Sequence, residues 1–341
     1  MLPPSEISLQ NTTFAAVVSV ILPFYNAQAS LSEAIDSVLL QSFTRFELIL
    51  VDNNSTDESL NIAKQFEKND FRITIENEKQ QGVRHAMNKG LSLTNFDLIA
   101  RIDADDEWYE QKLEKQVKFL ETHPEIDVIA TRAKYGGEAE GLSEYVKWSN
   151  SVCVEEQINN SIFIESPIIN PTVLFKKFLI DKYGPYHYGD KIPEDYEMFL
   201  RWHSKGVRMQ KIPEKLMLWN DFETRLTRSH KAYSVDAFNQ IKCKYLAEFL
   251  GERNQVWIWG AGRKTRNRAM MLKEYGIEIS GFIDIKKQKT TVAECIHFEQ
   301  IEIEIHNPII SFVANRGARE KIRAFLMAKG FSEMSDFILA S

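Results

Sequence analysis

Short apolar runs alternate with amphipathic segments along the first third of the chain. Four runs have the length and the branched, apolar composition of buried strands: VVSVIL (17–22), FELILVD (46–52), FRITIEN (71–77) and FDLIARID (96–103). Between them apolar positions recur at helical spacing, first from Leu31 onward, then over 56–68, where Ser55 and Glu58 have capping-box spacing, and over 83–93. This alternation predicts an α/β fold with a doubly wound, mostly parallel sheet and helices on both faces.

The rest of the chain shows a second start of the same pattern. We predict a helix over 108–122, a strand over 126–130, a helix over 192–206 that Gly206 ends and a helix over 234–250, with no defined element between 133 and about 160. From residue 254 a strand, a turn, a helix and a strand follow one another again. The predicted division is a loose arm over 1–15, an α/β domain over 16–233, a helical connector over 234–252 and a small α/β domain over 253–341.

Composition and charge narrow the class of protein. The 341 residues are 44% hydrophobic and 26% charged, which is ordinary for a globular protein, and the net charge of −6 argues against a nucleic-acid binder. The cysteines Cys153, Cys243 and Cys295 are far apart, which fits a reducing compartment and neither a disulfide framework nor a zinc site. The apolar run 14–25 lacks the positive flank of a signal peptide, and no run is long enough to span a bilayer. We therefore expect a cytoplasmic protein, at most in peripheral contact with the inner face of the membrane, whose oligomeric state the sequence leaves open.

Candidate chemistry gathers where strands end. Asp103, Asp105 and Asp106 directly follow an apolar run, and carboxylates so close repel one another unless a positive charge lies among them. Mg²⁺ and Mn²⁺ prefer oxygen ligands and bind through carboxylates together with substrate phosphates. Asp52 ends another strand, and ligands of such sheets lie at the carboxyl ends of the strands. We therefore predict that Asp103 and Asp105 hold a divalent metal and a nucleotide diphosphate, and that Asp106 caps the following helix.

Five motifs in a fixed order resemble those of family 2 glycosyltransferases with the GT-A fold. They are VSVILPFYN, FELILVDNNSTD, GVRHAMNKG, RIDADDEWY and PEDYEMFLRW. The segment LWNDFETRLTRSHKAYS and the following IWGAGRKTRNRAM are similar to a bacterial subgroup in which a small Rossmann-like domain follows the transferase. The resemblance implies a GT-A sheet, and a hexosyltransferase type of enzyme that uses a nucleotide sugar.

The resemblance assigns the nucleoside side of the site. Pro23, Phe24 and Tyr25 match the loop that lines the nucleoside, and Asp52 matches the acid beside the base and ribose. The family often has a second aspartate next, which accepts from the uracil N–H, whereas this chain has Asn53. Since an amide oxygen can also accept a hydrogen bond, a UDP-linked donor is expected.

Basic residues are expected on the diphosphate side. The family usually has arginine where Met87 stands, and Arg84, one helical turn earlier, is expected to replace that charge. Arg225 and Arg228 could close over the leaving diphosphate. Surface solvation remains the alternative for Arg225, Arg228 and His230, and a structural role is the alternative for Arg84.

The resemblance also assigns the metal and the catalytic base. Asp103 and Asp105 match the metal-binding D-x-D, with Asp105 as the direct ligand, and His230 is the candidate to complete the metal shell. Asp195 matches the base that takes the proton of the acceptor hydroxyl, with Glu194 in support; the alternative is that both acids only favour a helix N-terminus. A single base opposite the leaving group implies inversion, hence a β-linkage from an α-linked donor.

Three functions are candidates for this chain. The first is an inverting, metal-dependent glycosyltransferase that acts on a glycan acceptor, free or lipid-linked, in surface polysaccharide, lipopolysaccharide or related glycan synthesis. The second is an oxidoreductase or sensor that binds NAD(P) or another nucleotide through GAGRKT, where Thr265 takes the place of the third glycine and Asp284 ends the next strand. The third is a nucleotidyltransferase. Such an enzyme would need a glycine-rich, basic loop after the first strand, which this chain does not have.

Overall fold

The computed structural model describes most of the chain. The described residues are 17–189, 192–222, 231–286, 293–301, 305, 307–315 and 317–341. The arm predicted over 1–15 lies outside them.

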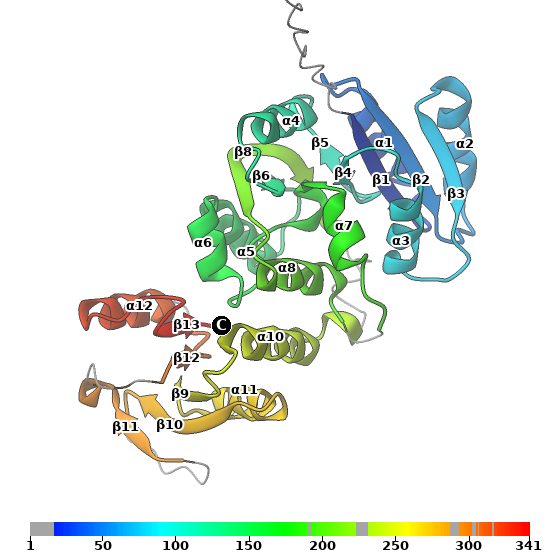
Figure 1. The fold of residues 1–341 in the computed structure, drawn as a ribbon. Coiled ribbons are helices and arrows are strands. Elements are labelled where there is room, and N and C mark those ends of the chain that lie inside the picture. The colour runs from blue at the N-terminus through cyan, green and yellow to red at the C-terminus, as the bar shows by residue number, and fades with distance from the viewer. Residues whose placement is uncertain are drawn as a thin grey trace, which may run out of the picture.

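Two sheets of unequal size organise the described chain (Figure 1). The larger one has the strand order β3-β2-β1-β4-β7-β6-β8-β5. Its parallel part consists of β1 (Val18–Phe24), β2 (Phe46–Asp52), β3 (Ile73–Asn77) and β4 (Leu98–Arg101). These strands are the four that the apolar runs predict. Because β1, β2 and β4 run side by side in one direction, the residues after each of them meet at one edge of the sheet.

The other half of this sheet is mixed. It consists of β5 (Glu107–Trp108), β6 (Val128–Tyr135), β7 (Leu174–Lys176) and β8 (Met209–Trp219). β7 runs antiparallel to β4 and β6, whereas β6 and β8 are parallel. The helix predicted from residue 108 begins only at Lys112, because Glu107 and Trp108 pair with Leu218 and Met217 of β8. That pairing brings the end of β8 beside the acidic loop after β4.

Helices cover both faces of the parallel half. They are α1 (Leu31–Leu39), α2 (Ser59–Asn69) and α3 (Val83–Leu93), and α4 (Lys112–Thr122) follows β5. α1 and α2 share one core with β1 and β2, and α3 packs into the core on the other face. The predicted capping box does not form: α2 begins at Ser59, and the Ser55 hydroxyl oxygen accepts the N–H of Asn26 at 3.1 Å. Ser55 therefore supports the loop after β1 instead of capping the helix.

Five short elements fill the middle of the chain. They are α5 (Glu140–Ser151), α6 (Glu155–Ser161), the 3-10 turn η1 (Asn170–Thr172), α7 (Phe178–Tyr183) and α8 (Glu194–Ser204). The first two lie where the sequence pattern predicts nothing. α8 agrees with the predicted helix, and Gly206 beyond its end has a φ of 72°, which favours glycine. The first turn of α8 carries Glu194 and Asp195.

A second, smaller sheet follows. The 3-10 turn η2 (Lys231–Tyr233) precedes α10 (Val235–Leu250), which Ser234 caps by accepting the N–H of Ala237. The remaining elements are β9 (Gln255–Trp259), α11 (Arg263–Glu274), β10 (Glu278–Asp284), β11 (Cys295–His297), the 3-10 turn η3 (Phe298–Gln300), β12 (Ile309–Ser311), α12 (Ala318–Ala328) and β13 (Phe337–Leu339). All paired strands of this sheet, in the order β11-β10-β9-β12-β13, are parallel.

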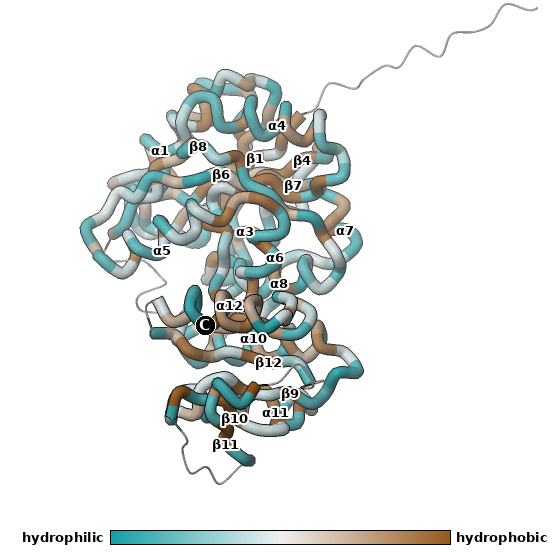
Figure 2. Tube along the Cα trace, turned by 90° about the vertical axis from the view of Figure 1, so that its left-hand side faces the viewer, coloured by the Kyte–Doolittle hydropathy of each residue, from teal (hydrophilic) through white to brown (hydrophobic). Residues whose placement is uncertain are grey.

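α10 lies between the two sheets and packs on α8 (Figures 1 and 2). The buried amine of Lys242 on α10 donates to the carbonyl of Ile164 at 2.8 Å and to that of Ala340 at 3.0 Å. One side chain thus joins a loop of the larger unit to the residue that follows β13 in the smaller one. Burial lowers the pKa of this amine to about 8. All three cysteines are free and buried. None of the helices in the described residues combines the length and apolarity that crossing a bilayer requires.

Candidate active site

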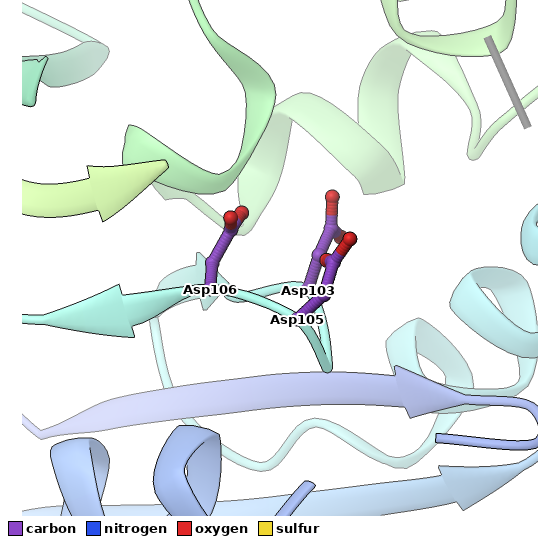
Figure 3. A group of neighbouring side chains, drawn as sticks. All are labelled: Asp103, Asp105 and Asp106. Atoms are coloured by element: carbon purple, nitrogen blue, oxygen red, sulfur yellow. The ribbon is translucent and has the colours of Figure 1, made fainter. Parts of the chain in front are cut away.

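Three carboxylates meet in the loop after β4. One oxygen from each of Asp103, Asp105 and Asp106 lies within 4.8 Å of the others, and all three side chains rise from the same side of the loop (Figure 3). The three side chains provide only oxygen atoms as possible metal ligands, and Mg²⁺ and Mn²⁺ prefer oxygen ligands. The donor set therefore fits the predicted divalent metal.

Asp106 does not cap the following helix, and that prediction was wrong. Its side chain is fully buried, and its Oδ1 accepts the N–H of Asn220, just after β8, at 3.1 Å. The next helix begins only at Lys112, after the β5 pairing. Asp106 thus belongs to the acidic cluster itself.

A cavity of about 130 Å³ adjoins these acids. It is lined by Ala29, Ser30, Glu33, Asp105, Asp106, Glu107, Asn220 and Phe222. The loop after β1 and the segment after β8 therefore both reach the acidic cluster.

The residues predicted to line a nucleoside lie at the same edge of the sheet. Pro23 and Phe24 are buried at the end of β1, whereas the side chain of Tyr25 is 51% exposed. Asp52 is almost fully buried; its two oxygens accept the N–H of Ser55 at 3.0 Å and the side-chain amide of Asn77 at 2.9 Å. Of these four residues, Tyr25 presents an open aromatic face.

Both the nitrogen and the oxygen of the Asn53 side-chain amide form hydrogen bonds to the loop before α3. Its nitrogen donates to the carbonyls of Glu78 and Gln80 at 3.0 and 2.8 Å, and its oxygen accepts the N–H of Gly82 at 2.7 Å. The side chain is 3% exposed. The oxygen that the sequence analysis offers to a uracil is therefore already engaged in positioning the loop before α3.

Arg84, in the first turn of α3, is buried and donates to the carbonyl of Gly189. On the same helix, Asn88 exchanges two hydrogen bonds with the backbone of Tyr186, at 2.8 and 3.0 Å. α3 thus fixes the segment that leads to α8.

Arg101 is a site residue that the sequence analysis missed. Its Nε donates to Asp103 at 2.8 Å, and its guanidinium lies 3.4 Å from the hydroxyl of Tyr186, with only 4% of the residue exposed. Burial works to lower the pKa of Arg101, but the charges of Asp103, Tyr186 and Glu194 leave it well above the usual value. A signal was present in the sequence: an arginine inside an apolar strand, two residues before Asp103 and so on the same face.

The two acids of α8 lie within the electrostatic field of this cluster. Glu194 is 3% exposed, and both its oxygens accept from the Tyr233 hydroxyl, at 2.8 and 2.6 Å. Burial and then the charge of Glu194 raise the pKa of Asp195 to about 7, against the opposing charge of Arg101. The charge of Asp103 contributes to the same rise. Asp195 therefore carries a carboxyl group that can take up a proton near neutral pH.

Arg225, Arg228 and His230 lie outside the described residues. On either side of them, Asn220 binds Asp106 and Tyr233 binds Glu194. The described ends of this stretch therefore contact both the acidic cluster and α8.

The turn that contains Gly260, in the smaller sheet, is stabilised by hydrogen bonds to Asp284 of the same sheet. Asp284 accepts the N–H of Ala261 at 2.6 Å and that of Lys286 at 3.2 Å. Gly260 has a φ of 101°, and a Cβ there would lie 2.9 Å from Val313. The carboxylate that the second function offers to a ribose thus supports the turn itself.

Comparison with known proteins agrees with this arrangement. The model of glycosyl transferase family 2 matches residues 19–184. The putative glycosyltransferase EpsE of Bacillus subtilis is 43% identical over 116 residues, which are 33% of this chain and 42% of EpsE. The putative teichuronic acid biosynthesis glycosyltransferase TuaG of the same organism is 32% identical over 152 residues, 44% of this chain and 60% of TuaG. The chain thus spans less than two thirds of the length of both relatives.

Among solved structures, S. aureus TarS 1–349 in complex with UDP-GlcNAc has the same fold. It aligns with a TM-score of 0.56 at 18% identity, over 76% of this chain and 71% of TarS. The aligned region exceeds the segment that the family model matches. The segment that matches glycosyl transferase family 2, residues 19–184, contains the sheet edge and the acidic loop described above.

Proposed function

We propose that the chain is an inverting, divalent-metal-dependent glycosyltransferase that moves a sugar from a nucleotide sugar to a hydroxyl of a glycan acceptor. The observation that carries the proposal is the presence of two groups of acids: the Asp103, Asp105 and Asp106 cluster, and Asp195, whose pKa is raised to about 7 by burial, by Glu194 and, to a smaller extent, by Asp103. The first suits a metal and a diphosphate, and the second suits a base that works at neutral pH.

The acidic cluster would hold the metal. We assign Asp103, Asp105 and Asp106 to it, of which Asp103 is fixed by Arg101 and Asp106 by Asn220. When bound, Mg²⁺ or Mn²⁺ supplies positive charge that neutralises the diphosphate of the donor and stabilises it as it leaves. Tyr25 would stack on the nucleoside, while Asp52 and Asn53 hold the loops around it.

Asp195 would act as the base. Its carboxylate takes the proton of the acceptor hydroxyl as the hydroxyl oxygen forms a bond to the anomeric carbon of the donor sugar. The bond from that carbon to the diphosphate oxygen breaks, and its electron pair leaves with the nucleoside diphosphate. One displacement inverts the anomeric centre. Tyr233 fixes Glu194 beside Asp195, and the charge of Glu194 helps to keep the base near neutral pKa.

The donor and acceptor are proposed from the relatives. TarS was crystallised with UDP-GlcNAc, and TuaG is named for teichuronic acid biosynthesis. We therefore propose a UDP-linked donor and an acceptor in surface polysaccharide or a related glycan. We also propose residues 16–233 as the transferase domain, 234–252 as the connector and 253–341 as a Rossmann-like domain that supports it.

The test is a screen of nucleotide sugars with Mn²⁺ or Mg²⁺, scored by release of the nucleoside diphosphate. We expect release from at least one UDP-sugar, only with metal present. Binding of NAD(P) without turnover of any nucleotide sugar would contradict the proposal and favour the oxidoreductase or sensor.

The pH dependence follows from the pKa of Asp195. The base must be ionised to accept a proton, and its pKa is about 7. We expect log(kcat/KM), at saturating metal, to rise with unit slope as the pH increases toward 7 and to level off above it. A profile that is flat through neutral pH, or that falls there, would remove Asp195 from the role of base.

Arg101 is expected to set the position of this profile. Its charge lowers the pKa of Asp195, so Arg101→Met should move the midpoint of the profile to higher pH, by about one unit. It should also lower kcat about tenfold, because Asp103 loses its ion pair. Arg101→Lys keeps the charge and should restore the midpoint. A purely structural role would lower the amount of active enzyme without moving the midpoint.

A further inference from the structure

A second cavity lies away from the acids, where the larger and smaller units meet. It measures about 410 Å³, within the usual range of ligand sites, and is open to solvent. It is lined by Glu155, Glu156, Asn159, Asn160, His203, Phe249 and Met334. These residues come from α6, from the ends of α8 and α10, and from the turn before β13, which lie together in Figure 1. The family match, residues 19–184, includes only the α6 wall.

Polar side chains line this cavity and are open to solvent. Glu156 is exposed, and Asn159, Asn160 and His203 are partly exposed; within the described part of the chain these four side chains make no hydrogen bond to protein. Glu155, by contrast, is held by Arg208 at 2.8–3.0 Å. The amides and the imidazole offer both donors and acceptors. A ligand that forms hydrogen bonds with these side chains needs both donor and acceptor groups.

The floor of the cavity is aromatic. The His203 ring lies edge-on to Phe163, with centroids 5.6 Å apart, and at 5.8 Å from Phe249. Burial lowers the pKa of His203 to about 4, so the imidazole is neutral at physiological pH. Met334, which has a φ of 66°, adds its thioether from the smaller unit. An aromatic and thioether floor suits the C–H face of a ring rather than an extended charged chain.

Charge excludes the main alternative ligand. None of the described residues that line the cavity is lysine or arginine, and the nearby cation of Arg208 is already paired with Glu155. Arg208 likewise neutralises Glu155, so Glu156 is the lining carboxylate whose charge repels phosphates and nucleotides. A neutral, hydroxyl-rich ring satisfies the amides, the imidazole and the aromatic floor together.

We propose that this cavity is a binding site for a neutral sugar unit of the glycan acceptor, away from the point of transfer. The identification of the ligand as acceptor rests on the proposed function. His203 lies about 12 Å along α8 from Asp195, at a helical rise of about 1.5 Å per residue. Residues 196–202 between them are buried, so a glycan that reached both ends of α8 would pass outside the helix. The site would favour long acceptors over short ones.

The test measures saccharide binding directly, on the full chain. The probes are neutral tetrasaccharides of glucose, N-acetylglucosamine, mannose and galactose at millimolar concentration, detected by saturation-transfer NMR. We expect at least one to bind, and the double change Asn159→Ala with Asn160→Ala to weaken it at least tenfold. Phe249→Ala should do the same, and Asn69→Ala, an exposed asparagine on α2, should change nothing. UDP binding with Mn²⁺ should be the same in all variants.

Two controls separate this site from the catalytic one. Asp105→Ala should keep the saccharide while losing metal-dependent UDP binding, so a failed transferase assignment and a failed saccharide site give different results. With a long acceptor, the double asparagine variant should raise KM tenfold and leave kcat unchanged. The proposal is overturned if no tetrasaccharide binds, if the double variant binds as well as the parent chain, or if inorganic phosphate or spermine binds there instead.

Discussion

Asp195→Asn is expected to lower kcat about a thousandfold while donor binding stays within twofold of the parent enzyme. Asparagine keeps the shape of the side chain but cannot accept the proton of the acceptor, and general base catalysis typically contributes 10²- to 10⁴-fold. The measurement is sugar transfer under single-turnover conditions, with calorimetry of UDP and Mn²⁺ alongside. Loss of rate without loss of binding is the result that a base requires.

The matched control is Asp181→Asn. Asp181 also lies in the first turn of a helix, α7, but is exposed. Its replacement should leave kcat unchanged. If Asp195→Asn kept more than a tenth of the activity, the acid would only favour the start of α8, which is the alternative to its role as base.

Asp105→Ala is expected to abolish metal-dependent binding of UDP and to lower activity about a thousandfold. It removes one of three carboxylates that lie within 4.8 Å of one another, and with it several kcal/mol of stabilisation of the leaving diphosphate, at about 1.4 kcal/mol per tenfold in rate. Titration of Mn²⁺ and UDP by calorimetry measures the loss. Chelation with EDTA should remove the activity of the parent enzyme, and added Mn²⁺ or Mg²⁺ should restore it.

Asp36→Ala is the control for this change. Asp36 is an exposed aspartate on α1, outside the acidic cluster. Its removal changes the net charge by the same amount and should leave UDP binding intact. Equal loss in both variants would show that net charge, and not a metal site, governs binding.

The sequence predicts the parallel half of the fold because each of its strands is a continuous apolar run. β8 has no such signature, since its middle carries Pro213, Glu214 and Lys215, and β5 has only two residues. β5 is a strand because it pairs with β8, and β8 is a strand because it pairs with β6 and β5. Pairing between residues more than 80 positions apart leaves no local pattern. For the same reason the helix predicted from 108 was placed four residues too early.

The residues of the candidate site also differ in how far the sequence alone predicts them. The sequence offers Asp103 and Asp105 as candidates through their position at a strand end, and Asp195 through the resemblance. Arg101 was missed, although its place inside an apolar strand, two residues before Asp103, is a signal that the sequence carries. Tyr233 was missed because it reaches Glu194 from 39 positions along the chain. The prediction for Asp106 failed because its partner, Asn220, follows a strand that the sequence does not reveal.

The raised pKa of Asp195 has a consequence for the folding equilibrium. The unfolded chain ionises this aspartate near its ordinary pKa of 3.8, and the folded chain only at about 7, so the folded state gains protons relative to the unfolded one between these values. The contribution of Asp195 to the free energy of unfolding therefore falls as the pH rises from about 4 to about 7, by at most about 4 kcal/mol before solvent screening. A selection of variants by thermal stability alone would therefore favour the replacement of Asp195, and the enzyme would lose its proposed base.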